Sequence, residues 1–129
     1  VPVSFEEDRN TTAALAVAQK LRADGGKITC LHVVESLPHF ATEFVPVGHL
    51  ESARTELTAS LEEMISDVPD AQAVVIDGSA ANAILNFARD HAKDLIIVAS
   101  HRPGMSDYLL GSTAARVVRH ATCAVHVIR

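Results

Sequence analysis

The sequence predicts an α/β domain in which helices cover both faces of a parallel sheet. Segments with strand character alternate with segments of helical periodicity along the whole chain, and the strand-like runs are apolar at nearly every position. A strand that is apolar throughout is typical of a parallel sheet covered on both faces, because each right-handed crossover packs back on the sheet. With 129 residues, the chain has the size of one domain, so we expect a single domain over residues 1–129.

Five segments have strand character. They are residues 1–3, Ile28–Val34, residues 73–76, Leu95–Ala99 and residues 123–128. The first resembles the tail of a strand, and the chain does not start with Met. We therefore expect that native residues are missing before Val1.

Four helices are expected between these strands. Asn10 or Thr11 can cap the first helix by accepting hydrogen bonds from free backbone N–H groups, and Gly25-Gly26 can end it. Ser79 can cap the third, and the fourth is expected over residues 111–120. Apolar residues recur at helical spacing in the first three: Ala14, Val17, Ala18 and Leu21; Leu50, Ala53, Leu57, Leu61, Met64 and Ile65; and Ala81, Ile84, Leu85 and Ala88. Residues 35–48 and 100–110 are expected to form long loops.

Composition excludes several classes of protein. A net charge of −5 argues against nucleic-acid binding, whose affinity comes largely from Lys and Arg at phosphates. No run is long and apolar enough to cross a bilayer, and no secretory signal opens the chain. Cys30 and Cys123 lie in apolar runs, which favours buried thiols over a disulfide. Free thiols in turn favour a cytoplasmic location. The seven His lack the mutual spacing of metal ligands.

The loops at one edge of the sheet are the expected binding site. Parallel sheets of this kind bind ligands beyond the carboxyl ends of their strands. Residues 3–5, 33–35 and 98–102 should meet there. The fourth helix starts at the same edge, at Gly111-Ser112, and a helix start presents free N–H groups and partial positive charge to phosphate.

Side chains around this helix start could add to phosphate binding. Gly111 lets a ligand approach the backbone closely, the hydroxyls of Ser112 and Thr113 can donate hydrogen bonds, and Arg102 can add a bidentate contact. Taken alone, however, a Gly-Ser pair is more often only a helix cap, and an Arg in a loop is usually solvated. The pattern by itself leaves both interpretations open.

The carboxyl-terminal third resembles the signature of the universal stress protein family. The matching segments are Ser100-His101-Arg102-Pro103, then Tyr108-Leu109-Leu110-Gly111-Ser112, and residues 115–121 and 125–129. The Ser-His-Arg-Pro form is most similar to the bacterial F-type branch. The resemblance extends over essentially the whole chain and implies a three-layer fold of the adenine nucleotide alpha hydrolase-like kind. Its five parallel strands would lie in the order 3-2-1-4-5.

The resemblance also implies an ATP site, with possible Mg²⁺. Many members bind ATP through a motif of Gly, two residues, Gly, nine residues, then Gly-Ser or Gly-Thr. Ala99 and Arg102 stand at the first two glycine positions, as in the similar F-type branch, and Ser4 stands where the family usually has Asp. Carried over position by position, the implied site comprises Pro2, Ser4 and Val33 at the nucleoside, Val98, Ala99 and Ser100 at the ribose, and Arg102, Gly111, Ser112, Thr113 and Ala114 at the phosphates.

The predicted function is that of an ATP-binding regulatory or stress-response module. The alternative is a stress protein that does not bind ATP and acts through protein–protein contacts. Ser4 favours it, and so does the spacing from Arg102 to Gly111, which is one residue shorter than in the family motif. An enzyme is disfavoured, because Ser100 and His101 are neighbours that point apart at a strand end. The last strand, from Ala124 to Arg129, should lie at a sheet edge, and by the resemblance it would form a homodimer interface. Neither a nucleic acid nor a membrane is an expected partner.

Overall fold

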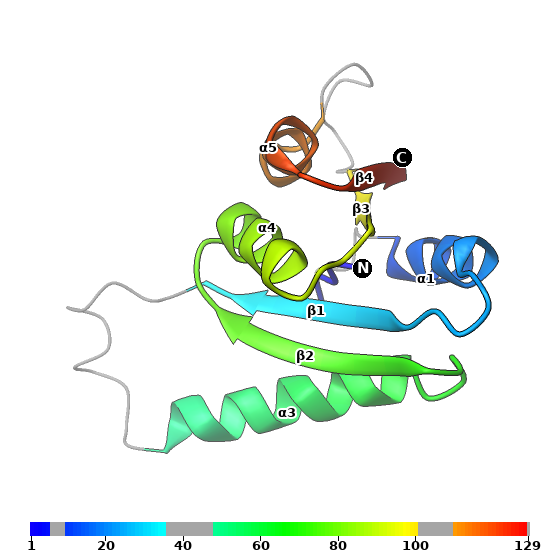
Figure 1. Ribbon diagram of the computed structural model, residues 1–129. Coiled ribbons are helices and arrows are strands. Elements are labelled where there is room, and N and C mark those ends of the chain that lie inside the picture. The colour runs from blue at the N-terminus through cyan, green and yellow to red at the C-terminus, as the bar shows by residue number, and fades with distance from the viewer. Residues whose placement is uncertain (6–9, 36–47, 101–109, 129) are drawn as a thin grey trace.

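Helices and strands alternate in the structure as the sequence predicts. The computed structural model describes residues 1–5, 10–35, 48–100 and 110–128. In chain order the elements are α1 (Thr11–Leu21), β1 (Ile28–Val34), α3 (His49–Met64), β2 (Ala71–Asp77), α4 (Ala80–Asp90), β3 (Leu95–Ala99), α5 (Ser112–His120) and β4 (Ala124–Ile128) (Figure 1). None of the helices among these residues is long and apolar enough to span a bilayer.

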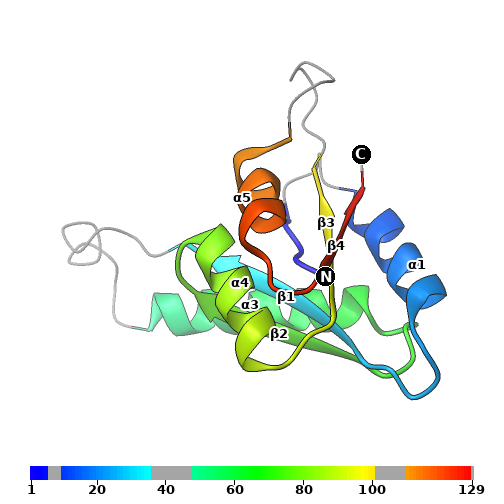
Figure 2. The same ribbon diagram turned by 45° about the horizontal axis from the view of Figure 1, so that its top comes forward.

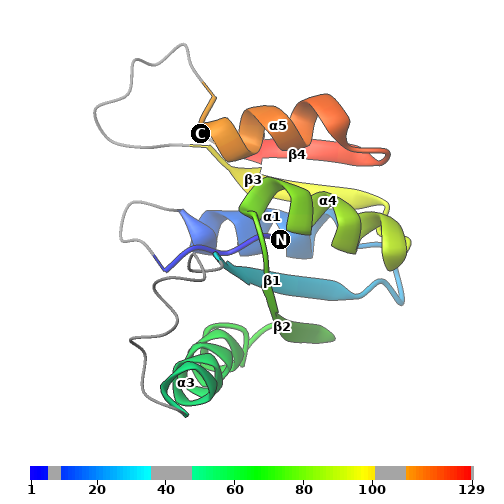
Figure 3. The same ribbon diagram turned by 90° about the vertical axis from the view of Figure 1, so that its left-hand side faces the viewer.

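The strands lie between two groups of helices. β1 pairs with β2 and β3 pairs with β4, both in parallel. Figure 2 shows α4 and α5 on one side of β3 and β4, with α1 on the other. Figure 3 shows the strands stacked between α3 at one end and α5 at the other. The described residues therefore form the expected arrangement of helices around parallel strands.

Two apolar cores explain this arrangement. Residues of α1 and α3 pack in one core with Ile28 and Cys30, whereas residues of α4 and α5 pack in the other with Leu31. Neighbouring residues of β1 thus point to opposite cores, as the alternation of a strand requires. Because both faces are covered, β1 needs apolar side chains at nearly every position, and this is why its sequence lacks an alternating polar pattern.

The predicted single sheet of five strands is not observed among the described residues. In the described residues four strands form two separate sheets, β1–β2 and β3–β4. Residues 1–3 make one parallel bridge, between Pro2 and Leu31. The Val3 N–H donates to the Leu31 carbonyl over 2.8 Å, and the Leu31 N–H donates to the Val1 carbonyl over 2.9 Å. So short a segment, with a proline that has no N–H to give, makes too few ladder hydrogen bonds to count as a strand.

Most predicted boundaries are close to the observed ones. Asn10 caps α1, since its Oδ1 accepts a hydrogen bond from the Ala13 N–H over 3.1 Å. The helix ends at Leu21, before the glycine pair, and Gly25 takes the left-handed conformation in the following turn, with φ of 76°. β2 is longer than the predicted residues 73–76. The fourth helix and last strand each start one residue later than predicted.

Two predictions about helices were wrong in part. Ser79 occupies the N-cap position of α4, but its hydroxyl makes no capping hydrogen bond. In α3, Leu61 is fully buried, whereas Leu50 and Met64 are exposed. The apolar spacing of α3 therefore overstates the length of helix that packs against the strands. Residues 36–47 and 101–109, which hold most of the two predicted loops, lie outside the described residues.

Candidate functional site

A cavity of about 500 Å³ lies at the carboxyl ends of the strands. The amino-terminal segment, the end of β1, the end of β3 and the first turn of α5 all contribute to its wall. The expected meeting of residues 3–5, 33–35 and 98–102 is thus found for those that are described. The lining residues are Pro2, Val3, Ser4, Phe5, Thr11, Leu31, His32, Val33, Glu35, Leu57, Ala80, Ile84, Val98, Ala99 and Thr113.

The structure brings together six of the eleven predicted site residues in this lining. These are Pro2, Ser4, Val33, Val98, Ala99 and Thr113. Ser100, Gly111, Ser112 and Ala114 do not line the cavity themselves, but each lies within two positions of Ala99 or Thr113 in the chain. Arg102, the predicted guanidinium contact, lies outside the described residues.

Ser100 fixes the start of α5 beside the end of β3. Its side chain is buried, and its Oγ accepts a hydrogen bond from the Gly111 N–H over 3.3 Å. Its own N–H donates to the Ile128 carbonyl over 2.8 Å. Ser100 therefore connects three elements, β3, β4 and α5, which makes it a positioning residue rather than an open ligand contact.

The start of α5 is suited to an anion. Gly111 is the N-cap and has no side chain with which to cap the helix, and the first turn has no acidic residue. The first N–H groups of a helix have no partner within the helix, and they carry partial positive charge. Thr113 from this turn lines the cavity. The turn can therefore offer backbone donors and a hydroxyl to a phosphate group.

The fold itself does not require a glycine at position 111. Its φ is −56°, which any residue can adopt. Among the described residues, a Cβ built on it would meet nothing nearer than the Ser100 carbonyl oxygen, at 3.9 Å. Neither backbone strain nor crowding by the described residues explains this glycine, which is among the residues favoured at an N-cap.

Phe5 and His32 form part of the site that the sequence analysis missed. Their rings meet edge to face, with centroids 4.8 Å apart, and both line the cavity. His32 Nδ1 lies 2.9 Å from the Val3 carbonyl oxygen. A carbonyl only accepts, so Nδ1 carries the hydrogen, and in the neutral imidazole Nε2 is then an acceptor. His32 is half-buried, and the sequence analysis did not foresee its place in the wall.

The signal for Phe5 was present in the sequence. It is an aromatic residue directly after Ser4, in a segment already assigned to the binding edge. Phe5 is 36 % exposed, which is normal for a single apolar residue at a surface, so its place in the site rests on the cavity lining. Glu35 adds a carboxylate to the lining, which repels phosphate and favours a phosphate position nearer α5.

Comparison with known proteins decides the family. The model of the Universal stress protein family matches residues 1–129. This chain belongs to the universal stress protein family. Universal stress protein G of Shigella flexneri is 30% identical to it over 136 residues, which cover 100% of this chain and 96% of that protein. The universal stress protein of Methanothermobacter thermautotrophicus is 27% identical over 114 residues, covering 80% of this chain and 76% of the relative.

Solved structures of stress proteins have the same fold. UspA from Lactobacillus plantarum superposes on this stress protein with a TM-score of 0.76 and 25% identity, covering 100% of this chain and 94% of that one. A universal stress protein in complex with cAMP superposes with a TM-score of 0.70 and 18% identity, covering 100% and 93%. The second likeness shows the shared fold alone. The resemblance to the F-type branch stays a prediction.

Proposed function

We propose that this stress protein binds ATP in the cavity at its strand ends and acts as a nucleotide-dependent regulatory module of the stress response. One observation carries the proposal. The uncapped start of α5 and an exposed aromatic ring, two features suited to the two ends of a nucleotide, contribute to the same cavity of about 500 Å³. A pocket of this size is in the usual range for a small-molecule site.

In this proposal the triphosphate lies against the first turn of α5. The backbone N–H groups after Gly111 and the hydroxyls of Ser112 and Thr113 donate to phosphate oxygens. Arg102 adds the guanidinium contact expected from the sequence. Mg²⁺ would be held mainly by the phosphates and water, because this ion keeps several waters in nucleotide sites. Among the described residues no cluster of three or more His, Cys, Asp or Glu could hold a metal by itself.

The nucleoside occupies the other end of the cavity. Pro2, Ser4 and Val33 would contact the base, and Val98 and Ala99 the ribose. The exposed ring of Phe5 offers the base a face for stacking, which also helps nucleobase binding in other proteins. The Nε2 atom of His32 is an acceptor in the same wall, and an adenine amino group is a suitable donor for it.

The proposal also includes the strand order, the dimer and the cellular location that the sequence predicts. Residues 1–3 would act as the central strand of a single sheet in the order 3-2-1-4-5. β4 lies at the edge of its sheet, and we propose that a second copy pairs there along residues 124–129 to form a homodimer. Cys30 and Cys123 are both free thiols, which fits the reducing cytoplasm that we propose as the location.

A stress protein that does not bind ATP is the second candidate. Ser4 favours it, since a hydroxyl replaces an acceptor atom of the usual carboxylate but not its charge. Titration calorimetry with ATP and Mg²⁺ separates the two candidates. Binding heat together with a rise in the thermal midpoint supports ATP binding, whereas no heat and no thermal shift would leave only protein–protein contacts.

Two further titrations define what the site recognises. cAMP has the same base but one phosphate in a ring, so weaker binding than ATP is expected if the first turn of α5 holds the triphosphate. GTP keeps the phosphates and changes the base, so the difference between its affinity and that of ATP measures how strongly the site recognises adenine. We propose no catalysis, and multi-turnover ATP hydrolysis at about one per second or faster would instead favour an enzyme.

A further inference from the structure

The ring of His32 leaves one hydrogen-bonding atom available in the wall of the candidate nucleotide site. His32 lines the cavity, and its Nδ1 atom is hydrogen-bonded to the Val3 carbonyl oxygen. Among the described residues, its Nε2 atom has no partner. We propose that Nε2 of His32 selects the purine: it accepts a hydrogen bond from a 6-amino purine when the ring is neutral and donates to a 6-oxo purine when the ring is protonated. This inference rests on the proposed nucleotide function.

Contacts on two sides hold the ring in one orientation. Nδ1 donates to the Val3 carbonyl over 2.9 Å, because a carbonyl can only accept. Phe5 packs against the ring edge to face, with centroids 4.8 Å apart and the planes at 61°. The backbone of His32 lies in the β1–β2 ladder, opposite Val75. The ring is therefore ordered before a ligand arrives, and an ordered group loses less entropy when it binds.

The two protonation states of a histidine ring have opposite preferences for a purine. In the neutral imidazole of His32, Nε2 accepts and so matches the 6-amino group of adenine, whereas a 6-oxo purine would bring a second acceptor against it. In the imidazolium both ring nitrogens donate, so the match is reversed. A histidine ring ordinarily changes between these states between about pH 5 and about pH 8. The preferred base should therefore change with pH in this range.

The charged groups near His32 act on both kinds of purine nucleotide alike. Glu35 follows β1 directly and lines the same cavity. In β2, Asp77 pairs with Arg54 of α3. In the amino-terminal segment, the Val1 ammonium is hydrogen-bonded to a carbonyl of β1, and the first turn of α1 has no acidic residue. Because ATP and inosine triphosphate carry the same charge, the effect of these groups cancels in the ratio of the two affinities.

Titration calorimetry with ATP and inosine triphosphate gives the first test. The two nucleotides differ at position 6 of the purine, where an oxygen replaces the amino group. At about pH 7.5 ATP should bind about tenfold more tightly, the size of one hydrogen bond exchanged for two opposed acceptors. At about pH 5.5 this ratio should fall to about one or reverse. Protonation of the phosphates weakens both nucleotides equally, so an unchanged ratio at the two pH values would overturn the proposal.

Substitution of His32 gives the second test. His32→Asn keeps an N–H near the position of Nδ1 for the Val3 carbonyl but removes Nε2. The ratio of the two affinities should therefore be about one at both pH values. His32→Gln places an amide that does not titrate near the position of Nε2, so its ratio should be the same at both pH values. The thermal midpoint shows whether each variant is folded, and the pH series on the unchanged chain decides without either variant.

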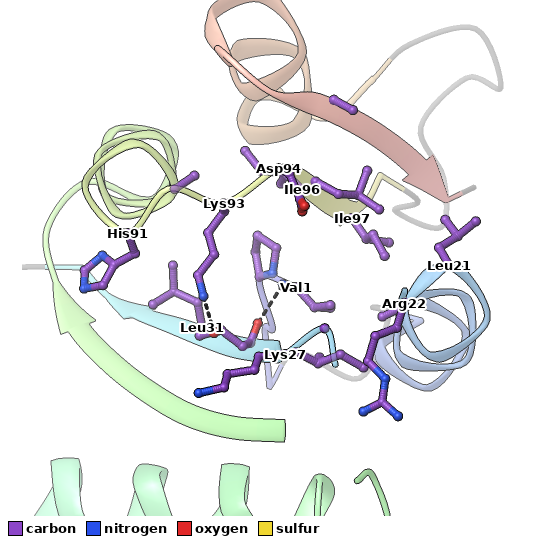
Figure 4. Close-up of a pocket in the computed structure, with 18 of the residues that line it drawn as sticks. Val1, Leu21, Arg22, Lys27, Leu31, His91, Lys93, Asp94, Ile96 and Ile97 are labelled. Atoms are coloured by element: carbon purple, nitrogen blue, oxygen red, sulfur yellow. Dashed lines mark hydrogen bonds between the residues drawn. The ribbon is translucent and has the colours of Figure 1, made fainter. Parts of the chain in front are cut away.

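His91 provides the matched control. Its Nδ1 lies 3.0 Å from the Phe87 carbonyl oxygen, and its ring stacks on that of Phe87 with centroids 3.9 Å apart. His91 thus makes the same two kinds of contact as His32, but it lines a hollow at the amino ends of the strands (Figure 4). His91→Asn should leave the ratio and its change with pH as in the unchanged chain. Equal effects of His91→Asn and His32→Asn would overturn the proposal.

The remaining outcomes separate this inference from the proposed function. If ATP binds and is still preferred in folded His32→Asn, another group recognises the base, so the inference is wrong while ATP binding stands. If the preference is lost in Glu35→Gln and kept in His32→Asn, the amino group binds to the carboxylate, which also overturns the inference. If neither nucleotide binds at either pH, both the proposed function and the inference are refuted.

Discussion

Replacing Gly111 separates the role of a helix cap from the role of a ligand contact. Among the described residues, a Cβ at this position makes one ordinary contact, 3.9 Å from the Ser100 carbonyl oxygen, and φ is −56°. The substitution Gly111→Ala therefore adds no strain to the fold. It adds a methyl group at the place where a phosphate would approach the backbone of α5 most closely.

The substitution should affect folding stability and ATP affinity by different amounts. Alanine is a poorer N-cap than glycine, so Gly111→Ala should cost about 1 kcal/mol of folding free energy or less, which is a fall of about 3–5 °C in thermal midpoint for a domain of this size. Losing one charge-assisted hydrogen bond from the phosphate costs about 1.5–3 kcal/mol of binding. ATP affinity should therefore fall about tenfold to about hundredfold, and further in Gly111→Val.

The assay is titration calorimetry at a temperature well below the midpoint of each variant. Gly111→Ser is a second probe, because serine is a good N-cap and should keep stability while its Cβ still obstructs the phosphate. Ser79→Ala is the matched control. Ser79 is the N-cap of α4 and makes no capping hydrogen bond, so both stability and affinity should stay nearly unchanged.

The placement of the phosphates would be refuted by a folded Gly111→Val protein that binds ATP within about twofold of the unchanged chain, a difference of about 0.4 kcal/mol. It would also be refuted if Ser79→Ala lowered affinity as much as Gly111→Ala does. In that case the loss of affinity would come from destabilised helix N-termini in general, not from a lost contact with the ligand.

Four further results are expected. Phe5→Ala should lower nucleotide affinity about tenfold through lost stacking of about 1–3 kcal/mol, with a smaller loss in Phe5→Tyr, as measured by calorimetry. Burial raises the pKa of the Cys30 thiol, so iodoacetamide should label it only after unfolding, and the stability that this shift contributes should be lost at alkaline pH, as pH rises through the raised pKa. Leu61→Ala removes a fully buried side chain and should lower the free energy of unfolding by about 2–5 kcal/mol in a urea titration. Val127→Pro removes an N–H from the edge of β4 that faces away from β3, so it should dissociate the proposed dimer in sedimentation without unfolding the chain; a dimer that persists contradicts pairing along this edge.

The sequence predicted the elements well because each has a local signal. The continuous apolar run of β1 reflects burial of both faces of the strand, because Ile28 and Leu31 pack in different cores. The cap of α1 follows from one short side chain, Asn10, at the right place. Burial along α3 was predicted less well, since spacing shows which side chains share a face but not how far the neighbouring strand extends beneath it.

Sheet pairing could not be predicted in the same way. Which strands are neighbours depends on contacts between segments far apart in the chain, and no local pattern of residues 1–3 encodes their single bridge to Leu31. The contact between Phe5 and His32 is of the same kind, because it joins two residues from different segments. The rule that strand ends meet at one edge, by contrast, predicted the meeting of residues 3–5 and 33–35, whereas the individual positions of Pro2, Ser4 and Val33 were implied by the family resemblance.

The amino-terminal segment holds part of the candidate nucleotide site in place. Pro2, Ser4 and Phe5 line that site, and three backbone hydrogen bonds to Thr29 and Leu31 hold the segment on β1. These hydrogen bonds restrict the motion of Ser4 and Phe5. Because a site that is already ordered loses less entropy on binding, they should help to set the nucleotide affinity.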